Sequence, residues 1–161
     1  MHIRPATEAD WPALWQVIKP VVDAGETYVW RPTPAPEQMQ QIWLEPPPWH
    51  VVVAEIDGEI VGTAKVGPNR PGRGAHVATA SFIVGPTHQG RGVGRALAEY
   101  VVEWASGAGY HGMQFNAVVE TNKAAIALWK SLGFSVIGTV PEAFDHATDG
   151  LVGLHIMYRA L

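Results

Sequence analysis

Residues 82–95, Phe-Ile-Val-Gly-Pro-Thr-His-Gln-Gly-Arg-Gly-Val-Gly-Arg, are the stretch that decides how this chain is interpreted. An apolar run predicts a strand that ends at Gly85-Pro86, and a helical pattern follows it at once. Between them lie three alternating glycines, Gly90, Gly92 and Gly94. Glycines let a backbone approach a ligand closely, and a helix start offers unpaired N–H groups and the positive end of a dipole. The loop therefore predicts a site for a phosphate or pyrophosphate.

The composition fits one soluble domain. The chain has 161 residues, of which 47% are hydrophobic and 16% charged, as is ordinary for globular proteins. It has no cysteine, which excludes disulfides, Cys–zinc sites and a thiol nucleophile. The start, Met-His-Ile-Arg-Pro, lacks a signal-like apolar segment, and no apolar run approaches the ~18 residues of a membrane span. We expect a single cytoplasmic domain over residues 1–161, with no membrane partner.

The charge distribution indicates a local anion and argues against nucleic acid as a partner. The net charge is −4, and no basic stripe is present. Three histidines show no partner at metal-ligand spacing, namely His76, His88 and His111, so we predict no metal. The arginines cluster only in glycine-rich loops, at Arg70, Arg73, Arg91 and Arg95.

Hydrophobic periodicity predicts eleven elements in the order β-α-α-β-β-β-α-β-α-β-β. Thr7 is expected to cap the first helix and Gly25 to close it, Asp57-Gly58 to turn a hairpin, and Thr121 to cap the last helix. The later helices are expected at Pro36–Leu44, Gly90–Ser106 and Asn122–Leu132. The strands are expected at His2–Pro5, Trp49–Ile56, Glu59–Val66, His76–Val84, Gly112–Val119, about Phe134–Thr139 and Leu151–Arg159. This order predicts a mixed α/β sheet with a strand–helix–strand unit at its centre.

Two interpretations of the glycine loop have to be weighed: a turn without a ligand, and a dinucleotide-binding loop. The loop could be a tight strand-to-helix turn in which glycine only relieves steric crowding. It could also belong to a dinucleotide-binding fold. Against the latter, the loop follows residue 85 instead of the first strand, and only about 70 residues remain. The acidic residue expected ~20 positions later is poorly placed, since Glu103 lies mid-helix and Glu120 comes late.

Two motifs resemble the GCN5-related N-acetyltransferases (GNAT). The first is similar to the family's motif A, and the second to its Asn-x-x-Ala-x-x-Leu-Tyr-x-x-x-Gly-Phe block. The element order over residues 2–160 also agrees with the family. The matching residues are Phe82, Val84, Pro86, Gln89, Gly92 and Gly94 in the first motif, and Asn122, Ala125, Leu128 and Leu132-Gly133-Phe134 in the second.

The resemblance implies one GNAT-like domain whose mostly antiparallel mixed sheet is flanked by helices, with acetyl-CoA as cosubstrate. The loop amides would hold the pyrophosphate, and the backbone near Val84 would pair with the pantetheine arm and polarise the thioester carbonyl. The implied cofactor-binding residues are Ile83, Val84, Gln89, Gly90, Arg91, Gly92, Val93, Gly94, Arg95, Asn122, Ala125, Leu128 and Trp129.

The acceptor side is assigned from fewer signals. Asn116 lies mid-strand beside the cofactor crevice, where it could orient the substrate amine or carboxylate or be a satisfied sheet asparagine. Glu120 ends the same strand and could act as a base or be a solvated strand end. Trp30, in the Pro-rich loop, is the tryptophan most expected to line a pocket. Other substrate-binding candidates are Glu26, Thr27 and Tyr28, which could also be plain loop residues, and Phe82.

The sequence departs from the family at both usual proton-transfer positions. Thr79 stands where many members have a glutamate base, and Trp129 where many have a tyrosine acid. A threonine cannot serve as a base at neutral pH, and an indole N–H donates a hydrogen bond but not usefully a proton. Three alternatives remain open. Other groups could take these roles, proton transfer could run through ordered water, or the substrate could bind already deprotonated.

These observations predict an acetyl-CoA-dependent N-acetyltransferase that acts on a small amine, such as an amino acid or its analogue. A free amine would attack the thioester directly in a ternary complex, with Asn116, Glu120 and Val84 as the catalytic candidates. The alternatives are a non-catalytic acyl-CoA-binding domain and a protein or peptide N-acetyltransferase. The resemblance also implies a possible homodimer through the C-terminal strands.

Overall fold

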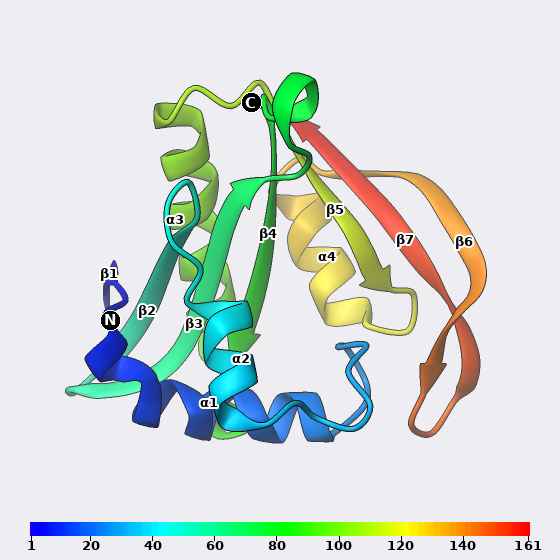
Figure 1. Ribbon diagram of the computed structural model, residues 1–161. Helices are drawn as coiled ribbons and strands as arrows, with labels where there is room; N and C mark the ends of the chain where they lie inside the picture. Colours follow the sequence, from blue (N-terminus) through cyan, green and yellow to red (C-terminus); the bar gives the residue numbers. More distant parts are fainter.

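The computed structural model describes residues 1–161, which build a seven-stranded sheet in the order β1-β2-β3-β4-β5-β7-β6 (Figure 1). Neighbouring strands are antiparallel except β4 and β5, which are parallel. The strands are β1 (His2–Pro5), β2 (His50–Ile56), β3 (Glu59–Pro68), β4 (Val77–Val84), β5 (Gly112–Val119), β6 (Ser135–His146) and β7 (Gly150–Ala160). The helices are α1 (Trp11–Asp23), α2 (Pro36–Trp43), α3 (Val93–Gly107) and α4 (Lys123–Ser131), with short 3-10 turns at Glu8–Asp10, Gly72–Gly74 and Pro86–His88. The predicted element order and fold class are confirmed.

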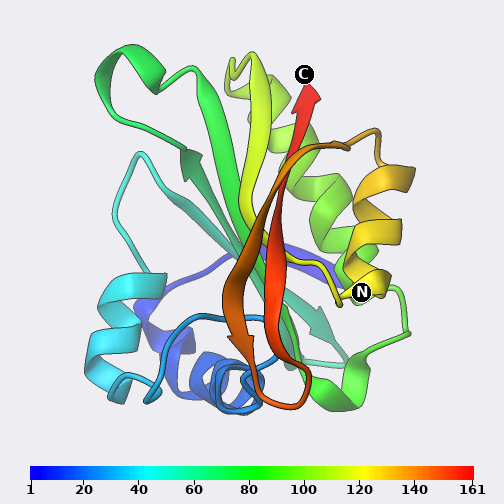
Figure 2. The same ribbon diagram turned by 90° about the vertical axis from the view of Figure 1, so that its right-hand side faces the viewer.

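The sheet lies between two helical layers, with α1 and α2 on one face and α3 and α4 on the other (Figure 2). Successive side chains along a strand point to opposite faces of the sheet, so each face has its own apolar core. Val53 and Ile83 pack with Leu14 and Trp43 of the α1/α2 layer. Residues of the opposite alternation, including Val52, Ala64 and Phe82, pack with Leu97, Val101 and Trp129 of the α3/α4 layer.

Thr7 caps the 3-10 turn Glu8–Asp10 and not α1, whose N-cap is Asp10. Three further predictions are wrong for identifiable reasons. The third helix begins at Val93 and not at Gly90, because Gly90 and Gly92 adopt positive φ angles of 74° and 82°. The cap of α4 is Asn122 and not Thr121, since the Asn122 side chain accepts a hydrogen bond from the Ala125 N–H. The last two strands are longer than predicted, because a register shift between Val140 and Phe144 absorbs Pro141 without ending β6.

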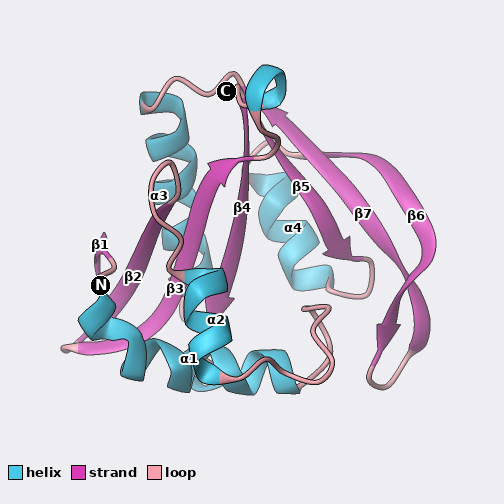
Figure 3. Cartoon of the chain, viewed as in Figure 1, coloured by secondary structure: helices cyan, strands magenta, loops and turns pink.

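The strands β4 and β5 separate soon after they meet (Figure 3). Only Val77–Gly112 and Ala78–Met113 are paired, and the rest of β4 has β3 as its one partner strand. On its other side β5 pairs with β7, with a bulge between Phe115 and Val118. Two neighbouring edges of the sheet are thus left open at its centre.

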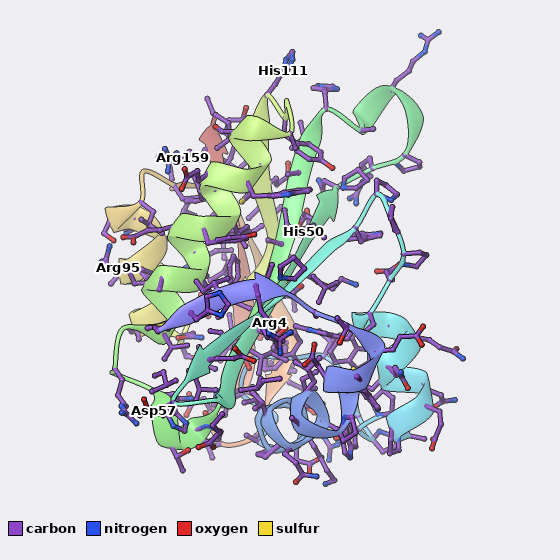
Figure 4. All side chains as sticks on the ribbon, turned by 90° about the vertical axis from the view of Figure 1, so that its left-hand side faces the viewer. Arg4, His50, Asp57, Arg95, His111 and Arg159 are labelled. Atoms are coloured by element: carbon purple, nitrogen blue, oxygen red, sulfur yellow. The ribbon has the colours of Figure 1, made fainter.

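An ion-pair cluster fixes β1 against the sheet on the side away from this opening. The Arg4 guanidinium lies 2.7 Å from Asp10 Oδ1 and 2.6 Å from Glu55 Oε1, and Figure 4 labels Arg4 near the N-terminal strand. These hydrogen bonds hold the pKa of the Asp10 carboxyl, and that of Glu55, below the usual range. The cluster joins β1, β2 and the start of α1.

Candidate active site

The open edge of β4 presents backbone groups to the gap between β4 and β5. Gly85 N–H donates to Val61 O at 2.9 Å and Asn69 N–H to Val77 O at 2.8 Å. These two bonds show that the odd-numbered residues of β4 are the ones that form main-chain hydrogen bonds with β3. In an antiparallel pair, every second residue turns its N–H and C=O away from the partner strand. For β4 these residues include Phe82 and Val84. Their main-chain groups therefore point into the gap, as the sequence predicts for Val84.

A cavity of about 420 Å³ fills this gap. It lies where the edges of β4 and β5, the start of α4 and the loop after α1 meet. No acidic or basic side chain lines it. Its predicted site residues are Thr27, Tyr28, Phe82, Ile83, Val84, Gln89, Asn116, Asn122, Ala125 and Trp129, and Trp30 lines it as expected.

The glycine loop at one end of the gap has the properties of an anion cradle. No backbone N–H from Gln89 to Arg95 donates to an acceptor within the protein. A Cβ added at Gly90 or Gly92 would meet no atom within 4 Å, so the loop is open on its outer side. Arg91 is exposed beside it. The free donors and the N-terminus of α3 fit the pyrophosphate of a CoA ester.

Arg95 and Leu128 join the two helices next to this loop. Arg95 Nη2 donates to Ser131 Oγ on α4 at 3.0 Å, and Figure 4 shows Arg95 on the side of α3 that faces α4. A Cβ added at Gly94 would lie 3.8 Å from Leu128 Cδ2 and 3.7 Å from Val84 Cγ2. These are ordinary van der Waals distances, so Gly94 lies at the place where α3 meets α4 and β4 without a steric need for glycine. Leu128 packs at this junction and does not line the cavity.

One face of α4 forms a wall of the cavity. Asn122, Ala125 and Trp129 follow each other at spacings of three and four residues, which places them on the same side of the helix. Asn122 Oδ1 accepts from Ala125 N–H at 3.1 Å, so its side-chain NH₂ group remains free to donate. The wall thus runs from a polar end at the helix start to an indole two turns further.

An aromatic cage holds Trp129. Its ring centroid lies 4.9 Å from that of Phe82, 4.7 Å from Phe115 and 6.2 Å from Phe134. The side chain is 7% exposed, and its Nε1–H forms no hydrogen bond within the protein. Because no buried side-chain nitrogen or oxygen lacks a partner, this N–H is accessible. Trp129 is also one of the residues that line the cavity.

The loop after α1 closes the α1/α2 side of the cavity. Tyr28 donates its hydroxyl to Phe82 O at 2.9 Å and stacks on Trp30 with 5.4 Å between ring centroids. Burial raises the pKa of the Tyr28 hydroxyl, so this group remains a donor at neutral pH. Thr27 also lines the cavity, whereas Glu26 is exposed outside it.

Asn116 occupies the bulge of β5 and is connected to two further amides. Its Oδ1 accepts from Gln114 Nε2 at 2.8 Å, and its Nδ2 donates to Asn69 Oδ1 at 2.6 Å. The side chain is exposed to the cavity and also satisfied, so the two alternatives considered for it are compatible. One hydrogen of Nδ2 remains for a ligand.

Glu120 lies apart from these groups. Its Oε1 accepts from Gly153 N–H at 2.6 Å, and it does not line the cavity. The structure therefore places its carboxylate at the end of β5, against the neighbouring strand β7. Sequence reasoning did not identify Asn69, Gln114 or Ser81, of which only Ser81 lines the cavity. An alternating polar pattern, Gln114-x-Asn116, was the available signal for Gln114.

The structure contains neither a cluster of metal ligands nor a membrane-spanning helix. No three histidine, cysteine, aspartate or glutamate side chains lie together so that they could hold a metal ion. None of the helices combines the length and the apolar character that crossing a bilayer requires.

Comparison with known proteins identifies the family. The model of the "Acetyltransferase (GNAT) family" matches residues 11–134. This chain belongs to the GNAT family. Its resemblance to motif A and to the second block is thereby confirmed, and acetyl-CoA is its cosubstrate.

Solved GNAT structures resemble the chain over its whole length. A GCN5-related N-acetyltransferase from Kribbella flavida is 52% identical, with a TM-score of 0.95 over 99% of this chain and 97% of that one. A ribosomal-protein-alanine N-acetyltransferase from Brucella melitensis is 32% identical, with a TM-score of 0.90 and full coverage of both chains (100% each). An acetyltransferase from Salmonella typhimurium, solved with its cofactor acetyl-CoA, is 28% identical, with a TM-score of 0.83 over 100% and 94%.

A characterised relative adds information about substrates in the family. The L-methionine sulfoximine/L-methionine sulfone acetyltransferase of Pseudomonas aeruginosa is 30% identical over 87% of this GNAT chain and 83% of its own length. That enzyme is named for small amino-acid analogues, and the Brucella enzyme for a protein substrate.

Proposed function

We propose that this GNAT enzyme acetylates the amine of a small molecule, an amino acid or its analogue, by direct attack in a ternary complex. One observation carries the proposal: a single cavity brings the backbone of Val84, the α4 wall and the amide of Asn116 together. Acetyl-CoA supplies an activated acetyl group at this point. The amine nitrogen forms the new bond to the acetyl carbon, the carbon–sulfur bond breaks, and the nitrogen loses a proton.

Different residues along the cavity bind different parts of the two substrates. The amides of residues 89–95 bind the pyrophosphate, and the free NH₂ group of Asn122 binds the pantetheine arm. Val84 N–H donates to the thioester carbonyl oxygen, where negative charge develops. Asn116 orients the acceptor through its remaining N–H. Because no carboxylate lines the cavity, the acceptor amine loses its proton to water before or during attack.

The acceptor class is supported by the relatives and by the cavity walls. The Pseudomonas relative is named for methionine sulfoximine and methionine sulfone, which are small amino-acid analogues. Tyr28 and Trp30 close the α1/α2 side of the cavity, as suits a small acceptor. The Brucella structure favours a second candidate, the α-amine of a protein or peptide.

Two measurements test the proposal. Acetyl-CoA should raise the Tm and NADH should not, because the stabilisation follows ligand affinity. Release of free CoA should then be measured with amino acids, their sulfoximine and sulfone analogues, polyamines, aminoglycosides and Ala-starting peptides. Acceleration by an amino acid or analogue supports the proposal, and acceleration by peptides alone supports the second candidate. Tight acetyl-CoA binding that no amine turns over would identify a non-catalytic acyl-CoA-binding domain.

The proposed assembly is a homodimer through the C-terminal strands. The strand β6 forms an edge of the sheet and exposes apolar side chains, including Ile137 and Val140, at 61% and 49%. Unpaired edges with apolar side chains tend to be covered in solution. Sedimentation should give twice the mass of one chain, and a monomer at all concentrations would contradict this part.

A further inference from the structure

Trp129 lies on the α4 wall of the cavity, and its aromatic surroundings hold its indole in place. Three aromatic rings pack around Trp129, and its side chain is 7% exposed. A side chain held this firmly loses little entropy when it binds a ligand. The N–H is nevertheless accessible and has no partner within the protein.

We propose that the Trp129 indole N–H is a catalytic group that binds the sulfur of CoA and stabilises it as a thiolate. The proposal rests on acetyl transfer in this cavity. As the amine forms its bond to the acetyl carbon, the carbon–sulfur bond breaks and its electron pair goes to sulfur. The indole donates a hydrogen bond and keeps its proton, the nitrogen's proton passes to water, and the thiolate takes a proton from water after it leaves.

The order of groups along α4 places the sulfur near this indole. The free amides of the loop before α3 would hold the phosphates, and Asn122 and Ala125 line the cavity along which the arm would run. Trp129 follows on the same helix face, beyond Ala125 by one turn, and its neighbour across the cage is Phe82 of the open β4 edge. The Val84 amide lies on that same edge. A thioester whose carbonyl oxygen meets Val84 therefore brings its sulfur toward α4.

No charged side chain lines the cavity that could protonate the sulfur or lower its pKa by its charge. Within the cavity Tyr28 is the one titratable side chain, and its hydroxyl donates to Phe82 O. The charged groups of the surrounding elements have other partners or point to solvent. They are Glu120 on Gly153, Lys123 on Glu120 O, Arg95 on Ser131 and Glu99, Arg159 on Leu132 O, and the exposed Lys130.

The proposal is tested on CoA itself, without any acceptor. The thiolate absorbs in the ultraviolet, so the pKa of the bound CoA thiol can be titrated directly. We expect this pKa to lie below the ordinary thiol value of about 8.5 in the wild-type protein. Trp129→Phe should raise it by about one unit, which corresponds to about tenfold weaker binding of the thiolate form. An unchanged thiol pKa in Trp129→Phe overturns the proposal.

A matched variant separates the N–H from the packing of the cage. Phe134→Leu disturbs the same aromatic group, since the Phe134 ring stacks on Phe115 at 4.5 Å, but it leaves the indole in place and lies outside the cavity lining. We expect no change in the bound thiol pKa. An equal rise in both variants would show that packing is responsible and would also overturn the proposal.

A measurement on the wild-type protein covers the case in which Trp129→Phe does not fold. In proton–nitrogen spectra the Trp129 indole resonance should move downfield with CoA and not with desulfo-CoA, which lacks the sulfur. The same shift with both ligands contradicts the proposal. If CoA causes no thermal shift at all, the cofactor site of the proposed function fails as well, so the two failures are distinguishable.

Discussion

The hydroxyl of Tyr28 donates to the main-chain oxygen of Phe82 at 2.9 Å and so ties the loop after α1 to the open edge of β4. This bond closes the α1/α2 side of the cavity, and it gives a donor to a carbonyl that has no strand partner. Tyr28→Phe should lower stability by about 1 kcal/mol and raise KM for the acceptor, because a part-buried carbonyl loses its donor and the loop loses its attachment to β4. Isothermal calorimetry should show unchanged acetyl-CoA affinity.

A tyrosine far from the cavity provides the control for that prediction. Tyr100→Phe removes a hydroxyl that contacts His50 Nε2 at 3.3 Å on the α3 side. It should leave acceptor kinetics unchanged. If both variants alter KM equally, the Tyr28–Phe82 bond has no particular role at the acceptor site.

The amide chain of Gln114, Asn116 and Asn69 gives two variants with graded effects. Asn116→Ala should raise KM for the acceptor about tenfold, the usual cost of one hydrogen bond, and should leave acetyl-CoA affinity intact. Asn69→Ala should act in the same direction but less, since Asn69 only orients Asn116. Steady-state kinetics check both. Unaltered kinetics in Asn116→Ala would reduce this residue to a sheet contact.

The glycine loop allows a test that separates backbone strain from ligand binding. Gly92 and Gly58 adopt similar φ angles of 82° and 81°, and an added Cβ meets no atom within 4 Å at either position. Alanine should therefore cost about 1 kcal/mol of stability at both sites. Only Gly92→Ala should weaken acetyl-CoA binding, by about tenfold or more, because its methyl group enters the cradle. Equal affinities for the two variants would argue against phosphate binding at this loop.

The Arg4–Asp10 pair predicts a specific response to acid. Its hydrogen bonds depress the pKa of Asp10 in the folded protein, so the carboxylate adds stability above its unfolded pKa of about 3.9. This contribution is lost as the pH falls below about 4 toward the folded value. Urea unfolding between pH 7 and pH 2 should show a steep decline in the wild-type protein. Asp10→Asn should be less stable at pH 7 and should lose less on acidification, and parallel curves would refute the assignment.

Much of this architecture could be predicted from local patterns, and the exceptions have physical causes. The strand before Gly85 and the helix after Gly94 follow from apolar periodicity, and the cofactor loop follows from glycine spacing and the motif. The bulge at Asn116 could not be predicted, because it depends on the register of β5 against β7. The same holds for Asn69, which lies 47 residues from Asn116 in sequence. Glu120 has the chemistry of a base, but a long-range contact with Gly153 decides its position.

The short seam between β4 and β5 has a thermodynamic consequence. The N-terminal and C-terminal parts of the sheet are joined there by two ladder pairs, Val77–Gly112 and Ala78–Met113, and by the hydrogen bond from His111 N–H to His76 O just before them. An extended pantetheine arm that pairs with β4 would act as a missing strand and complete the sheet. Cosubstrate binding should then slow hydrogen exchange along both free edges. The enzyme would reach its most cooperative fold only when it is loaded and ready to react.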